Sequence, residues 1–99
     1  MTASQDAVER LIAENQALVR SIASTIARRL PPNVDTEDLI AYGQVGLAGA
    51  ARDFDPGRGT SFATFAYYRI RGAIYDGISR LSWTSTERDD RIHGGQLAS

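Results

Sequence analysis

Aromatic rings and guanidinium groups crowd into one short stretch of the chain, FATFAYYRIRGAIYD at residues 62–76. Half of the protein's aromatic residues lie in its first seven positions, and two arginines follow them. Rings on a helix surface give flat faces for unpaired bases, and arginines give positive charge for the phosphates between them. The stretch therefore has the side chains of a site for single-stranded nucleic acid. A partner-helix interface fits the same pattern, and this alternative stays open.

The spacing of these residues predicts a helix over about 61–81 with two different faces. An apolar stripe that includes Phe62 and Phe65 is expected to face the core. A second set of side chains, which we call the outer stripe, recurs in steps of three, four and seven residues. It consists of Thr64, Tyr67, Tyr68, Arg71 and Tyr75. These hydroxyl, ring and guanidinium groups are expected to point away from the core.

Two further helices are predicted upstream. Apolar residues at three- and four-residue steps predict a helix over about 5–29, which the LPPN sequence at 30–33 ends. A helix over 36–53 follows, with Asp35 or Thr36 as its cap. Its glycines at every third position, Gly43, Gly46 and Gly49, indicate close contact with another backbone. DPGRGT at 55–60 predicts an exposed turn.

The fold class is therefore all-α. We expect a compact three-helix bundle in residues 1–83, because the chain has no strand-like alternation and its 99 residues suffice for one core. The polar sequence of residues 84–99 predicts a short or flexible tail, with at most a short helix near 85–92, or the start of a linker to a next domain.

Composition excludes several function classes. With no cysteine and one histidine, the chain lacks a disulfide framework and a zinc set, and no cofactor is expected. There is no export signal and no apolar run long enough to cross a bilayer, so we expect a cytoplasmic protein without a membrane partner. An enzyme is the weakest interpretation, since Asp53 and Asp55 form a carboxylate pair with no nucleophile, metal set or phosphate loop beside it.

Charge is segregated along the chain. Residues 33–55 hold five carboxylates and one arginine, whereas residues 58–80 hold four arginines and one aspartate. An acidic segment followed by a basic and aromatic one indicates two partners on two surfaces, although solvated helix faces would give the same pattern.

Residues 35–74, DTEDLIAYGQVGLAGAARDFDPGRGTSFATFAYYRIRGAI, closely resemble region 2 of the sigma-70 family, the bacterial initiation factors that direct RNA polymerase to promoters. The DL pair, the G..GL..A helix, the FDP.RG turn and the F.T.A..RIRGA helix stand in register. The RIRGA form is similar to that of the alternative sigma factors of the flagellar, sporulation and stress type. The resemblance implies a region 2 bundle that acts without catalysis.

The resemblance assigns a partner to the acidic segment. In the family, the helix matching residues 36–53 docks on the clamp helices of the largest subunit of core RNA polymerase. The implied polymerase-binding residues are Asp35, Glu37, Asp38, Ala41, Tyr42 and Gln44. Ala41 and Tyr42 depart from the polar or acidic residues found in many relatives.

The resemblance also assigns promoter DNA to the basic and aromatic segment. Phe54, Phe65 and Tyr68 match family positions around a flipped adenine of the −10 element. The positions that face the upstream, still paired edge of that element are matched by Arg71, Gly72 and Tyr75. The implied mechanism is promoter melting by capture of unpaired non-template bases.

Three more residues complete the implied DNA-binding set: Tyr67, Arg69 and Arg80. The two arginines are expected to contact phosphates, which makes the affinity salt-dependent. The alternative for them is an ion pair with Asp76 or Asp53.

A second hypothesis is a sigma-like protein-interaction module. Such a module would be bound by polymerase or by an anti-sigma factor without reading a promoter, and both surfaces serve this idea equally.

Overall fold

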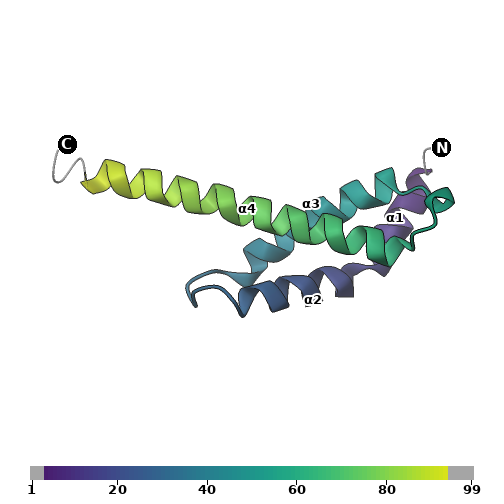
Figure 1. The fold of residues 1–99 in the computed structure, drawn as a ribbon, viewed down its shortest axis with the longest axis horizontal. Coiled ribbons are helices and arrows are strands. Elements are labelled where there is room, and N and C mark those ends of the chain that lie inside the picture. Colours follow the sequence, from purple (N-terminus) through teal and green to yellow (C-terminus); the bar gives the residue numbers. More distant parts are fainter. Residues whose placement is uncertain (1–3, 94–99) are drawn as a thin grey trace.

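Helices make up most of the part of the chain that the structure describes. The computed structural model describes residues 4–93, with the side chains of residues 4–80. Figure 1 shows its elements, which are α1 (Gln5–Glu14), α2 (Gln16–Ala27), α3 (Thr36–Asp53), the short 3-10 helix η1 (Pro56–Arg58) and α4 (Phe62–His93). The predicted all-α bundle is confirmed.

The predicted first helix is divided at Asn15, so the single helix over 5–29 was wrong at this point. The backbone of Asn15 has φ −118° and ψ 21°, outside the helical range. Its Nδ2 donates to the carbonyl of Leu11 at 2.7 Å, and Gln16 Nε2 donates to that of Ile12 at 3.0 Å. These side-chain amides satisfy carbonyls at the end of α1. Apolar periodicity continues across the break and therefore did not reveal it.

The core lies where α2, α3 and α4 meet. Its largest fully buried side chains are Val19, Leu39, Leu47, Ile70 and Ile74. The helices α3 and α4 cross at the glycines of α3. A Cβ on Gly46 would lie 2.5 Å from the Arg69 carbonyl oxygen and 2.8 Å from the Ile70 Cα. The close backbone contact predicted from the glycine spacing is thus confirmed.

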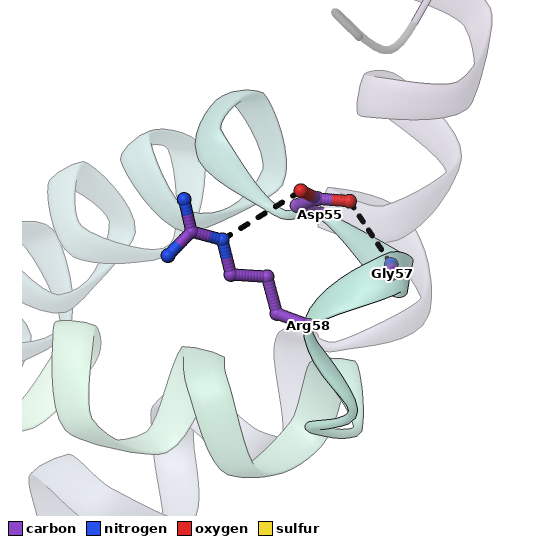
Figure 2. Close-up of polar contacts among 3 residues, drawn as sticks. All are labelled: Asp55, Gly57 and Arg58. Atoms are coloured by element: carbon purple, nitrogen blue, oxygen red, sulfur yellow. Dashed lines mark hydrogen bonds and ion pairs between the residues drawn. The ribbon is translucent and has the colours of Figure 1, made fainter.

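A capped turn joins α3 to α4 and sets the direction in which α4 begins. Asp55 Oδ1 accepts a hydrogen bond from the Gly57 amide at 2.9 Å, and Asp55 Oδ2 lies 3.7 Å from Arg58 Nε (Figure 2). Gly59 follows with φ 79°, a left-handed conformation that favours glycine. The residues of the turn are exposed, as predicted for DPGRGT.

The last helix is longer than predicted. Instead of ending near residue 81, α4 continues to His93, and Figure 1 shows its green-to-yellow half projecting beyond α2 and α3. No glycine or proline stands between Gly77 and Gly94, so the sequence contains no stop signal there. The prediction rested on the loss of apolar anchors, which does not end a helix. The expected boundary at residue 83 falls inside α4, and residues 94–99 of the expected tail lie outside the described residues.

Candidate nucleic-acid interface

Helix α4 has the two faces that its sequence predicts. Ala66, Ile70 and Ile74 on its inner face are fully buried. On the other side, Tyr67 is 40% exposed and Tyr68 66% exposed. Thr64, Arg71 and Tyr75 are exposed as well, so the whole outer stripe is accessible to a partner.

Contacts within the outer stripe hold its side chains in place. The guanidinium carbon of Arg71 lies 5.0 Å from the ring centroid of Tyr75, a cation–π distance. The rings of Tyr67 and Tyr68 meet edge to face, with centroids 5.2 Å apart. The stripe is therefore a surface of rings and positive charge whose side chains contact one another.

Three phenylalanines cluster where α3 passes into α4. The Phe54 ring lies 5.2 Å from that of Phe62 and 5.8 Å from that of Phe65, centroid to centroid. Phe54 and Phe65 line one open pocket of about 470 Å³. Tyr68 does not line it and instead borders a separate pocket with Gly72. Of the three residues expected around a flipped base, the structure thus brings two together.

Arg69 is turned toward α3. Its Nη2 lies 3.0 Å from Asp53 Oδ2, and its guanidinium carbon lies 5.5 Å from the Phe65 centroid. The same nitrogen would be 2.8 Å from a Cβ on Gly49, so the missing side chain makes room for it. Arg69 therefore has the carboxylate partner that was the alternative to a phosphate contact.

Arg80 also has a carboxylate partner. Its Nη2 donates to Asp76 Oδ2, one turn earlier on α4, and both side chains are largely exposed. A pair of this kind contributes at most about 1 kcal/mol and can be exchanged for another anion at little cost. The guanidinium thus remains accessible.

The acidic start of α3, which comprises Asp35, Glu37 and Asp38, is a second exposed surface. Asp35 caps the helix, because its Oδ1 accepts from the Glu37 amide at 2.9 Å. The two other carboxylates lie in the first turn, where the helix dipole stabilises negative charge. Ala41 is exposed one turn further along.

Two residues expected to bind polymerase also make contacts inside the protein. Tyr42 is half-buried, and its ring occupies the space that a Cβ on Gly77 of α4 would need. Gln44 exchanges two hydrogen bonds with Gln16, one of them from Gln16 Nε2 to Gln44 Oε1 at 3.0 Å. Both side chains therefore help to join α3 to its neighbours.

A groove between α2 and α4 was not predicted. One side of it is formed by Ser21 and Thr25 of α2 and by Arg29, which follows that helix. The other side is formed by three residues of the outer stripe, Tyr67, Arg71 and Tyr75. The signal was present in the sequence, because the α2 residues recur at four-residue steps and so share one face. Only the fold places that face beside α4.

The described part of the chain supports neither a metal site nor a membrane-spanning helix. Among these residues there is no group of three or more metal-ligating side chains. Nor is any helix within them both long and apolar enough to cross a membrane.

Comparisons with known proteins agree with the fold. The family model described as Sigma-70 region 2 matches residues 11–84. The chain is 41% identical over 91 residues to the RNA polymerase sigma factor FliA of Pseudomonas aeruginosa, and 40% identical over 78 residues to the RNA polymerase sigma-D factor of Bacillus subtilis. These alignments cover 90% and 76% of this chain but 37% and 31% of the relatives, so the chain spans about a third of their length.

A solved structure titled "Sigma-28(FliA)/FlgM complex" is similar to the chain with a TM-score of 0.67 and 35% identity, covering 91% of this chain and 41% of the solved one. The RIRGA sequence predicted an alternative sigma factor of the flagellar, sporulation or stress type, and the FliA and sigma-D relatives support the flagellar type. By its matching residues, its relatives and its fold, this chain belongs to the sigma-70 region 2 family.

Proposed function

We propose that this chain is a transcription initiation module that docks on core RNA polymerase and opens the promoter −10 element by capturing unpaired non-template bases. The observation that carries the proposal is the two-sided helix α4. Its apolar side is fully buried at Ala66, Ile70 and Ile74, while its tyrosines and Arg71 stay exposed. The relatives, which are named RNA polymerase sigma factors, support the assignment to transcription.

Base capture requires an energy source, because unstacking a base costs a few kcal/mol. Stacking on an aromatic side chain contributes about 1–3 kcal/mol per base, so two or three rings suffice to offset it. The pocket between Phe54 and Phe65 is the candidate for a flipped base, since aromatic rings border it. Tyr67 and Tyr68 offer further faces for the neighbouring bases.

Docking is assigned to the acidic start of α3. Its carboxylates are exposed, and in the sequence they are separated from the arginines of α4. Arginines on the clamp helices of polymerase are the complementary chemistry, because they bind carboxylates in a paired geometry.

A binding experiment tests the proposal. A labelled single-stranded oligonucleotide with a −10-like sequence is titrated with the chain, with and without core polymerase, and fluorescence anisotropy is measured. We expect binding that is tightest with polymerase present and that weakens when Tyr68 is replaced by alanine. Absence of binding in both settings would refute the promoter-opening function.

A second candidate is a protein-interaction module that does not read DNA. The solved structure similar to this chain is a complex with a second protein, FlgM, which favours a protein partner on this fold. Val45, 71% exposed, also borders a pocket with Tyr68, so both side chains are accessible to a protein partner. The anisotropy experiment separates the candidates, because this one predicts no affinity for the oligonucleotide.

A further inference from the structure

The groove between α2 and α4 has the composition of an anion site. Arg29 borders it from the C-terminal flank of α2 and Arg71 from α4, and within residues 4–80 no carboxylate lines it. Neither arginine has an ion pair among the residues whose side chains the structure describes, in contrast to Arg58, Arg69 and Arg80. Two exposed guanidinium groups thus share one open space.

Hydroxyl groups supply the other donors. Ser21 and Thr25 line the groove from α2, and Tyr67 and Tyr75 line it from α4. Thr25 Oγ1 accepts a hydrogen bond from Arg28 Nη2 at 3.3 Å, which leaves its own O–H free to donate. Arg71 is held over the Tyr75 ring, so its charge is already positioned.

The size of the groove limits what it can hold. Its volume is about 250 Å³, smaller than the roughly 300–1,000 Å³ typical of pockets for whole small-molecule ligands. A single charged group of a larger partner is the better match. Arginine and hydroxyl donors together are characteristic of contacts to nucleic-acid phosphates.

The charge of the surroundings selects the same partner. Residues 16–30 contain Arg20, Arg28 and Arg29 and no carboxylate. The groove also shares Tyr67, Arg71 and Tyr75 with the outer stripe, so a strand stacked on the stripe would run its backbone along the groove.

We propose that this groove holds one backbone phosphate of the promoter DNA, with Arg29 and Arg71 as joint ligands. The proposal rests on the DNA-binding function proposed above and deepens it, since it extends the DNA-binding surface from α4 to α2. Arg29 is thereby a binding residue that was not predicted from the sequence.

The salt dependence of binding tests this assignment. The affinity of the polymerase complex for a forked −10 oligonucleotide is measured by anisotropy between about 50 and 200 mM salt, and log K is plotted against log salt. Each phosphate contact contributes about 0.7 to the slope on single strands and about 0.9 on duplex. For Arg29→Gln we expect the slope to fall by one such contact.

Matched variants make the result specific. Arg20→Gln removes the same charge from α2 outside the groove and should leave the slope unchanged. Arg29→Gln combined with Arg71→Gln should lower the slope by one contact and not by two, because both arginines are needed to hold the same phosphate. Circular dichroism checks that each variant keeps its helices.

The outcomes separate the two proposals. A wild-type complex that does not bind the oligonucleotide overturns the DNA-binding function and this inference with it. The groove assignment alone is overturned if the wild-type complex binds but Arg29→Gln leaves the slope unchanged. It is also overturned if the slopes of Arg29→Gln and Arg20→Gln are equal. A double-variant loss of two contacts overturns the shared phosphate.

Discussion

Arg69 Nη2 lies 3.0 Å from Asp53 Oδ2, and this ion pair ties the first part of α4 to the last residue of α3. The same guanidinium lies 5.5 Å from the centre of the Phe65 ring. Arg69 thus stands between the acidic end of one helix and the aromatic pocket at the start of the next. These two contacts predict that Arg69 orients the pocket wall.

Replacing Arg69 with glutamine is expected to lower the stability slightly and to leave the salt dependence of DNA binding unchanged. The pair is 40% and 58% exposed, so its loss should cost about 0.2–1 kcal/mol. Asp53→Asn should have a similar cost, and the double variant should lose little more than either single variant. Chemical denaturation measures the stability. A slope of log K against log salt that falls by a full phosphate contact in Arg69→Gln would show that this arginine does bind the backbone.

Two glycine-to-alanine variants should act in opposite directions. Gly46→Ala places a Cβ 2.5 Å from the Arg69 carbonyl and must push α3 and α4 apart, a change that costs about 1–3 kcal/mol or more. Gly72→Ala meets nothing within 4 Å on the exposed side of α4 and should stabilise the helix by up to about 1 kcal/mol. Thermal unfolding followed by circular dichroism compares the stabilities of the two variants. Equal changes in stability would contradict the helix crossing at Gly46.

Tyr68→Ala should separate strand opening from docking. The side chain is 66% exposed, so its removal should change the free energy of unfolding by no more than about 0.5 kcal/mol. Loss of one stacked base should weaken capture of the opened strand by about 1–3 kcal/mol. Fluorescence of a 2-aminopurine placed in the −10 element reports opening, and a polymerase pull-down reports docking. Equal loss of both signals would contradict a role confined to DNA.

Charge neutralisation at the start of α3 should weaken docking, whereas loss of Gln44 should weaken the fold. Glu37→Gln together with Asp38→Asn removes two exposed carboxylates and is expected to lower the affinity for polymerase, most clearly at low salt. Gln44→Ala breaks its two bonds to Gln16 and should cost about 0.5–1.5 kcal/mol of stability per bond.

Polymerase affinity, measured by biolayer interferometry, and thermal unfolding give the two readouts for these variants. A Gln44→Ala protein that keeps its stability but loses affinity for polymerase would contradict this expectation and would support a docking role for Gln44.

Local sequence signals predicted much of this fold because the physics behind them is local. The cap at Asp35, the turn at residues 55–60 and the small residues at the helix crossing each follow from one residue type in one conformation. The two faces of α4 follow from helical spacing alone. The break at Asn15 escaped prediction because it depends on side-chain amides that bond to backbone carbonyls without disturbing the apolar period.

The contacts between distant segments were harder to predict. The packing of Tyr42 on Gly77 and the pairing of Gln44 with Gln16 both join different helices, and the ion pair of Arg69 with Asp53 was predicted only as an alternative. The sequence shows that these side chains can form hydrogen bonds or packing contacts. Which residues of the chain lie close enough to contact them depends on how the helices pack. For the same reason, the face of α2 at Ser21, Thr25 and Arg29 had no predicted role.

The absence of a side chain at Gly46 lets α3 and α4 touch backbone to backbone. This contact sets how closely the two helices approach, so the carboxylates at the start of α3 and the rings of α4 belong to one packed unit. A protein docked through the start of α3 would therefore hold the rings of α4 at a defined distance from its docking partner. The position at which the protein docks would then determine the position at which the DNA duplex opens.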